Sequence, residues 1–504
     1  MKIKSNHLQI IRFVTLLTLA FLLLPHFSFS QNIEWEQNYG GAGGDGAKSI
    51  KETNDGGYIV VGGTDSATND VTGNKGGGDL WVVKLDSIGN IEWENNFGGS
   101  ADEIANSVIQ ASDTTYAIAG WSLSSDGDLP SNYGNEDYWV LMIDTAGNKI
   151  WSKNYGGSGI DKAASIIKNS SGDLVIAGGS GSSDGDITLG DGYQGGYDYW
   201  ILHLDYGGGI IREFNYGGSS HEVATSIEQS SASGDYFISG RSTSSDGDAT
   251  TNYGGDDYWL IGLDNTFSLI WQKTLGSTGK DVATDVSETS SGNLIVSGFS
   301  DSADNDVSNI YGKKDYWILK LDNTGNLMWE QNYGGTSNDR ARAVNETGDG
   351  GFFVSGFSGS FDKDVSNNNG NHDYWGLKIY GSGAIEWEKN YGGSFNDRAS
   401  KYQQTNDNGF ILSGFSKSSD NDVSGNYGMR DFWIVKLKQC SNTIASITGN
   451  DTLTCYKTTD TLIGTGSTTN SGSIQYDWSV ISATGNITSD LGDSAIVDDS
   501  GTYR

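Results

Sequence analysis

Closely spaced aspartates recur along most of the chain, and carboxylates at such spacing could bind a cation or take part in acid–base chemistry. An Asp-x-Asp pair is followed nine to twelve residues later by an aspartate that directly precedes two aromatic residues. The six complete sets are Asp126, Asp128 and Asp137; Asp184, Asp186 and Asp198; Asp246, Asp248 and Asp257; Asp304, Asp306 and Asp315; Asp362, Asp364 and Asp373; and Asp420, Asp422 and Asp431. An earlier partial set keeps Asp70 and Asp79 but has Thr68 in the first place.

Two interpretations of these aspartates stay open. Calcium takes six to eight oxygen ligands, and carboxylates two residues apart can supply several of them together with loop carbonyls. The sets lack the twelve-residue pattern with a terminal glutamate that defines an EF-hand. Alternatively, Asp side chains in loops accept hydrogen bonds from nearby backbone N–H groups and hold the loop in shape. The sequence therefore predicts either calcium sites or loop caps that need no cofactor.

A second acidic position follows each Tyr-Gly-Gly run or its equivalent. Its members are Asp45, Glu103, Asp161, Glu222, Asp281, Asp339 and Asp397. If both kinds of loop lie on one face, that face is strongly acidic and could hold two carboxylates at the separation of about 5–9.5 Å used by glycoside hydrolases. Because every repeat carries these acids, no pair stands out. No catalytic residue is assigned, since His203, His221 and His372 lie in different repeats without a nucleophile motif.

The elements that must position these loops follow from a fixed period. A tryptophan stands two residues after the third aspartate of each set, at Trp81, Trp139, Trp200, Trp259, Trp317, Trp375 and Trp433. The spacings are 58 to 61 residues. Such self-similarity indicates one supersecondary unit stacked on copies of itself. Departures from the repeat, among them Ile211, His221 and Leu275, cluster in repeats three to five and indicate either a specialised sector or drift.

Each period contains four short runs typical of β-strands, separated by Gly, Asn and Asp. In the first repeat they span residues 33–39, 47–53, 58–63 and 80–86, and NDGG forms a hairpin signal between two of them. Four antiparallel strands per period predict an all-β, seven-bladed β-propeller over residues 31–438. The repeats lie near residues 33–90, 91–149, 150–209, 210–269, 270–327, 328–384 and 385–438.

The two ends of the repeat region predict how the ring closes. The last repeat stops at residues 431–438 without an outer strand, whereas the first begins with an additional strand at 33–39. Pairing of these two segments would complete the last blade and remove both exposed edges. The tryptophans of the first runs are expected to pack between blades and not to form a ligand platform. They are Trp35, Trp93, Trp151, Trp271, Trp329 and Trp387.

The flanking segments differ in composition from the repeats. Residues 1–30 have a basic start, an apolar run over 14–24 and small residues before Gln31, which is the pattern of a cleaved signal peptide. We therefore expect a secreted or cell-surface protein, and no segment long enough to span a membrane. Residues 439–504 are rich in Thr and Ser and predict a truncated Ig-like or PKD-like partial β-sandwich with Trp478 in its core.

The charge balance limits the classes of partner. The formal net charge is −33, and it becomes −36 without residues 1–30, which carry three basic and no acidic side chains. A surface of this sign repels nucleic acid and anionic lipid. Divalent cations or cationic partners remain compatible with it, as does a role in solubility alone.

The repeat resembles the secreted bacterial β-propeller repeat family abbreviated SBBP. The resemblance rests on YGGSGIDKAASI (155–166), SGDLVIAGG (171–179) and GGYDYWILHLD (195–205), and it recurs in register across about residues 33 to 438. Repeat five departs, with Leu275 in place of the tyrosine. The resemblance implies a propeller and export, but no single activity. The overall style of the chain is similar to exported proteins of Bacteroidetes, which implies type IX secretion.

The combined interpretation is a secreted, non-catalytic and monomeric propeller. It would bind extracellular polysaccharide or protein through its acidic loop face, in an adhesion or scaffold role. The alternative is a carbohydrate-active enzyme that uses a carboxylate pair on that face.

Overall fold

The computed structural model describes residues 32–187, 195–438, 460–463, 487–490 and 494–497. Every regular element in these ranges is a β-strand. Within the same ranges no helix has the length and hydropathy to cross a membrane. The predicted all-β class is therefore confirmed for the part of the chain that the structure describes.

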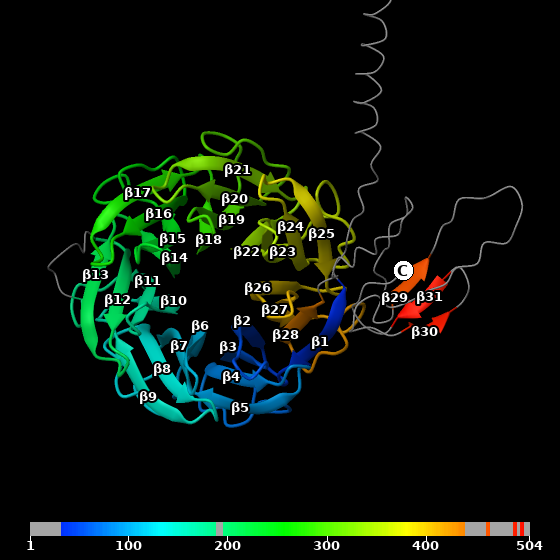
Figure 1. Ribbon diagram of the computed structural model, residues 1–504. Coiled ribbons are helices and arrows are strands. Elements are labelled where there is room, and N and C mark those ends of the chain that lie inside the picture. The colour runs from blue at the N-terminus through cyan, green and yellow to red at the C-terminus, as the bar shows by residue number, and fades with distance from the viewer. Residues whose placement is uncertain (1–31, 188–194, 439–459, 464–486, 491–493, 498–504) are drawn as a thin grey trace, which may run out of the picture. The chain divides into compact units, whose positions relative to one another are not determined.

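Seven four-stranded antiparallel sheets form a ring around a central opening (Figure 1). The inner strands are β2 (Asp45–Glu52), β6 (Glu103–Ser112), β10 (Asp161–Lys168), β14 (Glu222–Gln229), β18 (Val282–Glu288), β22 (Asp339–Glu346) and β26 (Asp397–Gln404). The second strands are β3 (Tyr58–Thr64), β7 (Thr115–Ser122), β11 (Leu174–Ser180), β15 (Tyr236–Ser242), β19 (Leu294–Ser300), β23 (Phe352–Ser358) and β27 (Phe410–Ser416). The third strands are β4 (Asp79–Leu85), β8 (Asp137–Asp144), β12 (Asp198–Leu204), β16 (Asp257–Leu263), β20 (Asp315–Leu321), β24 (Asp373–Ile379) and β28 (Asp431–Leu437). The outer strands are β5 (Ile91–Phe97), β9 (Lys149–Tyr155), β13 (Ile210–Tyr216), β17 (Leu269–Leu275), β21 (Leu327–Tyr333), β25 (Ile385–Tyr391) and β1 (Ile33–Tyr39).

We number the blades by their inner strands, from blade 1 (β2–β5) to blade 7 (β26–β28 with β1). Blade 7 is closed by the N-terminal strand, as predicted, because β1 pairs with β28 from Ile33↔Leu437 to Tyr39↔Phe432. The Trp433 indole N–H also donates to the Glu36 carboxylate at 2.7 Å. The first and last strands of the ring thus share one sheet, in which β1 takes the place that the outer strands hold in the other blades.

The repeated Asp-aromatic-Trp triplet joins neighbouring blades. The Tyr138 hydroxyl of blade 2 donates to the backbone carbonyl of Trp200 in blade 3 at 2.9 Å, and the two rings lie 4.5 Å apart. The same pair recurs as Tyr199–Trp259, Tyr258–Trp317, Tyr316–Trp375 and Tyr374–Trp433. All seven tryptophans of the triplets are fully buried. Burial of one large ring at each blade boundary contributes to inter-blade stability.

The tryptophans of the outer strands also cross blade boundaries, which confirms their predicted packing role. The indole N–H groups of Trp93, Trp151 and Trp271 donate to carbonyls in turns of the following blade, at 3.0–3.2 Å. These rings are only partly buried. They therefore support the rim of each boundary, and the rings of the triplets fill its centre.

Every inner strand contains a β-bulge after its third residue or the equivalent position. In β2, for example, the register shifts between Ala47 and Ser49, so that Lys48 is the additional residue. The seven bulge residues are Lys48, Asn106, Ala164, Thr225, Thr284, Arg342 and Ser400. A bulge changes the direction of a side chain. The side chains of the bulge residues line the central opening.

Strand alternation places two kinds of connection on the same face of the ring. These are the connection from each outer strand to the next inner strand and the connection from each second strand to the third strand. We call this side the loop face. Within the described ring, the strand connections on the opposite side are tight hairpin turns.

The C-terminal segment contributes three short described strands. β29 (Asp460–Ile463), β31 (Ser494–Val497) and β30 (Ile487–Asp490) pair in that order as an antiparallel sheet. The predicted signal peptide and Trp478 lie outside the described residues. The Ig-like or PKD-like assignment stays a prediction.

Candidate functional site

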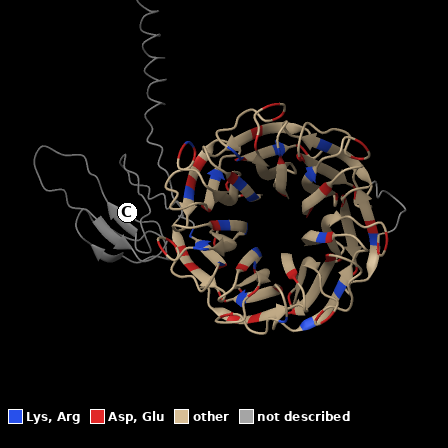
Figure 2. Cartoon of the chain, turned by 180° about the vertical axis from the view of Figure 1, so that it is seen from behind, with Lys and Arg blue, Asp and Glu red and all other residues tan. Residues whose placement is uncertain are grey.

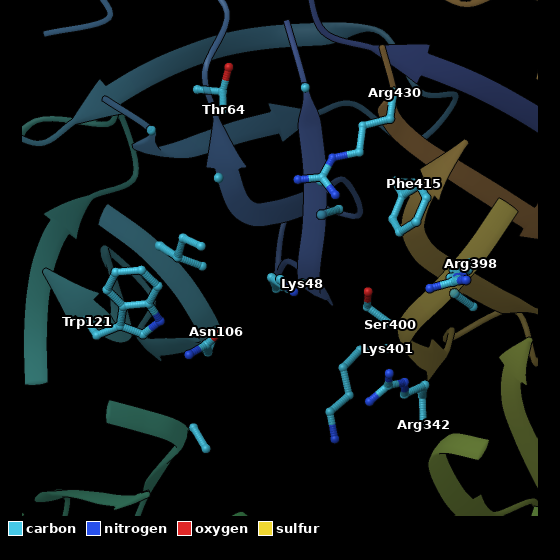
Figure 3. A pocket seen from close by; sticks show the side chains of 18 of the residues that line it. Lys48, Thr64, Asn106, Trp121, Arg342, Arg398, Ser400, Lys401, Phe415 and Arg430 are labelled. Atoms are coloured by element: carbon cyan, nitrogen blue, oxygen red, sulfur yellow. The ribbon is translucent and has the colours of Figure 1, made fainter. Parts of the chain in front are cut away.

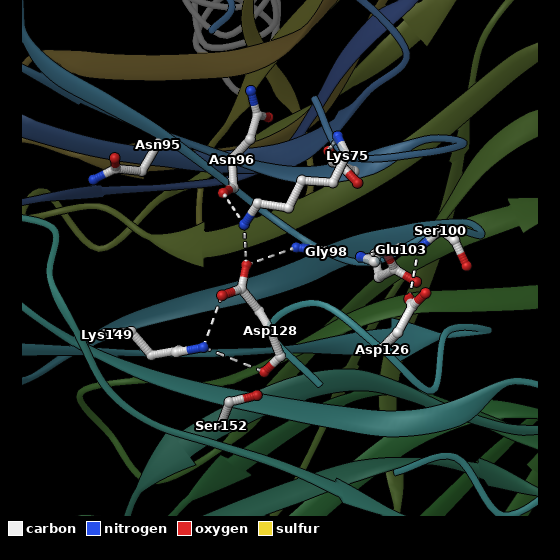
Figure 4. Close-up of polar contacts among 12 residues, drawn as sticks. Lys75, Asn95, Asn96, Gly98, Ser100, Glu103, Asp126, Asp128, Lys149 and Ser152 are labelled. Atoms are coloured by element: carbon white, nitrogen blue, oxygen red, sulfur yellow. Dashed lines mark hydrogen bonds and ion pairs between the residues drawn. The ribbon is translucent and has the colours of Figure 1, made fainter. Parts of the chain in front are cut away.

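The first aspartate of each acidic set caps the neighbouring Gly-rich connection on the loop face. In blade 2, Asp126 Oδ1 accepts the backbone N–H of Ser100 at 2.8 Å (Figure 4). The same bond recurs for Asp184, Asp246, Asp304, Asp362 and Asp420, at 2.7–2.8 Å. In blade 1 the Thr68 hydroxyl accepts the corresponding N–H of Ala42 at 3.0 Å. Replacement of the carboxylate by a hydroxyl fits a capping role, since both groups accept a backbone hydrogen bond.

The second aspartate of each set binds the first glycine of the same connection. Asp128 Oδ2 accepts the Gly98 N–H at 3.2 Å, and Lys75 and Lys149 form ion pairs with the same carboxylate (Figure 4). Burial acts to raise the pKa of Asp128, but the hydrogen bonds from Lys149, Lys75 and Gly98 outweigh it and hold the pKa below its usual value. The equivalent bonds of Asp70, Asp186, Asp248, Asp306, Asp364 and Asp422 measure 3.1–3.2 Å.

The third aspartate is buried and holds the tip of its own loop. Asp137 Oδ2 accepts the N–H of Tyr133 at 2.6 Å, four residues before it. Asp79, Asp257, Asp315, Asp373 and Asp431 make the same bond, at 2.5–2.7 Å. The partner residue for Asp198 falls at 194, outside the described residues. The three aspartates of a set therefore accept hydrogen bonds from three different backbone N–H groups. Their carboxylates do not come together around one position.

These bonds bear on the choice between calcium sites and loop caps. Among the described residues no three His, Cys, Asp or Glu side chains come together in a way that could hold a metal ion. The oxygens of the acidic sets accept backbone N–H groups, which favours the capping interpretation. Calcium binding stays a prediction.

Pairs of carboxyl groups lie at the blade boundaries and are buried. The third aspartate of one blade approaches the acidic residue that follows the next Tyr-Gly-Gly run. Asp137 and Asp161 form such a pair, and neither has any exposed surface. The first glycine of the intervening connection, Gly156, lies between them: a Cβ atom there would come within 2.6 Å of both carboxylates. A buried pair cannot contact a glycosidic bond. This geometry disfavours the enzyme alternative at these pairs.

The histidines provide no catalytic cluster within the described residues. His203 Nε2 lies 3.0 Å from Asp173 Oδ2 in blade 3, and His372 Nδ1 lies 2.7 Å from Asn396 Oδ1 at the boundary of blades 6 and 7. His221 is in blade 4. The three residues remain in separate blades, as their positions in the sequence indicate.

The loop tips carry exposed tyrosines, which the sequence reasoning missed. Tyr133, Tyr253, Tyr311 and Tyr427 are 37% to 52% exposed. Their backbone N–H groups are the ones that the third aspartates accept. The signal was an Asn-Tyr-Gly or Ile-Tyr-Gly triplet four residues before the third aspartate. Four large, amphipathic side chains are thus presented on rigid, capped loops of one face.

The chain matches no protein-family model and no curated protein. The SBBP resemblance therefore stays a prediction. Solved structures that it resembles include the WD40 domain of Neurospora crassa Pan2, at 13% identity and a TM-score of 0.44, covering 78% of this chain and 89% of that one. Sqt1 from Chaetomium thermophilum shares 9% identity with a TM-score of 0.41, covering 80% of this chain and 100% of that one. BBS1N, solved in complex with ARL6DN, shares 9% identity with a TM-score of 0.43, covering 82% of this chain and 97% of that one. The assignment of the seven-bladed ring rests on the strand pairing of the chain itself.

Proposed function

We propose that the ring is a non-catalytic binding module of an exported protein, and that it recognises extracellular polysaccharide or protein through the tyrosines of its loop face. The observation that carries the proposal is the set of exposed tyrosines on loops whose backbone is fixed by buried aspartates. Tyrosine supplies a large contact area at a low cost in side-chain entropy, and a fixed loop reduces the cost of ordering on binding.

The chemistry of the tips suits both classes of partner. A tyrosine ring can pack on the apolar face of a sugar or of a protein side chain, while its hydroxyl stays hydrogen-bonded. The signal-like segment and the resemblance to secreted propeller repeats support a partner outside the cell. The propeller would then act as an adhesion module or a surface scaffold.

The experiment compares tyrosines on the two faces of the ring. Tyr133, Tyr253, Tyr311 and Tyr427 are replaced by Ala in the full chain, and Tyr380→Ala in a turn on the opposite face is the control, since Tyr380 is also 52% exposed. Binding to xylan, laminarin, alginate and mannan is measured by affinity electrophoresis, and binding to proteins of the parent organism's cell surface by cross-linking.

We expect the fourfold variant to lose affinity at least tenfold for the partner that the unchanged chain binds, and Tyr380→Ala to keep it. Binding that survives all four substitutions, or that Tyr380→Ala weakens equally, contradicts the proposal.

A further inference from the structure

The central opening of the ring contains a cavity of about 640 Å³ (Figure 3). All seven bulge residues of the inner strands line it, from Lys48 in blade 1 to Ser400 in blade 7. The bulge therefore aims one side chain from each blade into the same space. Because the backbone repeats, the chemistry of the cavity depends only on which residue each blade places there.

Several of the bulge residues have structural partners. The side chains of Asn106, Thr225 and Thr284 each donate to an alanine carbonyl in the inner strand of the next blade, at 2.8–3.1 Å. Ala164 is apolar, and Ser400 is small. The two charged bulge residues, Lys48 and Arg342, are both cationic and take no part in these inter-blade bonds.

The cavity is basic although the whole chain is strongly acidic. Its cationic lining residues are Lys48, Arg342, Arg398, Lys401 and Arg430, and all five belong to blades 6, 7 and 1, which are neighbours in the ring. They are five of only 31 basic residues in a chain of net charge −33. In Figure 2 positions of Lys and Arg, coloured blue, lie on strands around the central opening.

Among the described residues, the acidic lining residues Asp65, Asp102 and Glu103 form no ion pair with these cations. Asp102 Oδ1 accepts the Gly78 N–H at 2.8 Å, and Glu103 Oε2 accepts the Gly99 N–H at 2.7 Å. Asp65 likewise accepts the Gly44 N–H. At least one oxygen of each carboxylate is thus engaged by a backbone group of blades 1 and 2.

Four of the five cations make no ion pair with any described residue. Lys48, Arg342, Arg398 and Arg430 have no carboxylate within 4.0 Å, whereas Lys401 pairs with Asp285 at 2.7 Å. The Arg398 Nε atom is buried without a hydrogen-bond partner among the described residues.

The unpaired cations also repel one another. Burial, and then the charges of Arg340 and Arg398, lower the pKa of Arg342 to about 10. Desolvation inside the ring, and then the charges of Arg342 and Arg430, lower the pKa of Lys48, although its side chain remains open to the central opening. Like charges held together without counterions destabilise a fold, and a bound anion would relieve that cost.

Stacking on aromatic rings fixes the arginines and leaves their donors free. The guanidinium carbon of Arg398 lies 4.8 Å from the centre of the Phe357 ring, and that of Arg430 lies 5.3 Å from the Phe415 ring. A guanidinium held in this way over a ring keeps its N–H groups available for planar, bidentate bonding to an oxyanion. Figure 3 shows Arg342, Arg398, Arg430 and Lys48 around the cavity.

An ion pair joins the inner strands of blades 5 and 7 on the side away from the loop face. Lys401 follows the bulge of β26 in blade 7, and its partner Asp285 follows the bulge of β18 in blade 5. The equivalent position in blade 6, between them, is the small Ala343. The pair lies one residue beyond the bulges, toward the face opposite the loop face.

We propose that the central cavity is a binding site for a small polyanion that carries two or more carboxylate, sulfate or phosphate groups. Lys48, Arg342, Arg398 and Arg430 would bind the anionic groups, and the aromatic rings would hold the arginines in place. The site is separate from the exposed tyrosines, so it does not depend on the proposed function of the loop face.

The test is isothermal titration calorimetry of the full chain with citrate, inositol hexakisphosphate, sodium sulfate and sodium phosphate, each at matched ionic strength in sodium chloride. Citrate tests carboxylates, and the other three distinguish sulfate from phosphate. The variants are Arg342→Gln with Arg398→Gln, and Lys48→Met as a second, independent change in the cavity. The control is Arg212→Gln, because Arg212 is an exposed arginine on the outer strand β13.

We expect at least one of the polyanions to bind, the double arginine variant to weaken it at least tenfold, and Arg212→Gln to leave it unchanged. Since removal of the arginines also removes their repulsion, the ligand-free double variant should melt at the same temperature or higher. Two results would overturn the proposal: no binding of any of the four anions to the unchanged chain, or binding that neither the double variant nor Lys48→Met weakens.

Discussion

At the scale of single residues, each blade boundary buries two carboxyl groups around one glycine. Asp315 and Asp339 form such a pair, and Gly334 lies between them. A Cβ atom at this glycine would come within 2.7 Å of both carboxylates. Burial, and then the charges of Asp339 and Asp364, raise the pKa of Asp315 to about 7. The pKa values of Asp79 and Asp431 rise to about 6 for the same reason, which is chiefly burial.

These raised pKa values predict that stability falls as the pH rises from 5 to 8. The unfolded carboxyl has a pKa near 3.8, so in this window the folded state binds a proton that the unfolded state does not. Each such carboxyl then removes up to about 1.4 kcal/mol of unfolding free energy per pH unit, until the pH passes its folded pKa. Melting temperatures at pH 5, 6, 7 and 8 would measure the slope.

Asp315→Asn tests the assignment, since the amide resembles the protonated carboxyl. We expect this variant to have a shallower dependence of melting temperature on pH, and to gain stability relative to the unchanged chain at pH 8. Asp304→Asn is the control, because Asp304 is exposed and hydrogen bonds from Thr278 lower its pKa. An unchanged slope in Asp315→Asn would show that this carboxyl does not titrate in the window.

The capping aspartates carry a second prediction at this scale. Asp126 and Asp128 already accept backbone N–H groups, so removal of divalent cations should leave the loops intact. We expect the melting temperature of the full chain to agree within about 1 °C in EGTA and in millimolar calcium. A rise of several degrees with calcium, by preferential binding to the folded state, would instead assign these loops as metal sites.

At the scale of elements, the strand β1 determines whether the ring stays closed. Glu36 in β1 accepts the Trp433 indole N–H at 2.7 Å and the Ser424 backbone N–H at 3.2 Å. Glu388 in β25 makes the same two contacts within blade 6, with Trp375 and Ser366. Glu388 also accepts the Ser366 hydroxyl, so its loss removes one more bond, but of the two glutamates only Glu36 joins segments from opposite ends of the ring sequence.

We therefore expect Glu36→Ala to lower the melting temperature more than Glu388→Ala. Each change removes a charge-assisted hydrogen bond worth about 1.5–3 kcal/mol, and in β1 this loss also favours detachment of the strand. Hydrogen exchange of the amides of β1 and β25 would measure the effect directly. Equal exchange rates for the two strands in their respective variants would contradict a special role of β1 in closure.

At the scale of the whole molecule, a symmetric backbone carries an asymmetric set of charges. The cations of the central cavity come from blades 6, 7 and 1, whereas the departures Ile211, His221 and Leu275 fall in blades 3 and 4. Leu275 is buried, and Ser277 donates to Asp281 at 2.8 Å, so the boundary before blade 5 keeps its structure without the tyrosine. Specialisation is therefore expected at the bulge positions, where a change of side chain does not alter the ring.

The sequence by itself determined the fold, because the same pattern of strands, turns and tryptophans recurs seven times along the chain. The fixed period of the buried tryptophans, the four β-rich runs per period and the surplus strand at residues 33–39 predicted seven blades and their closure. It also placed the aspartates on the loop connections. It left the choice between calcium sites and caps open, since that choice depends on which backbone N–H groups each carboxylate reaches.

Only the tertiary structure decided where side chains from different repeats meet. Lys48, Arg342 and Arg430 are separated by up to 382 residues in the chain and have no shared local pattern. The closed ring brings their strands to one axis, and a bulge in each inner strand selects the side chain that faces the cavity. A register shift of this kind depends on pairing with the neighbouring strand, so hydrophobic periodicity within a single run does not reveal it.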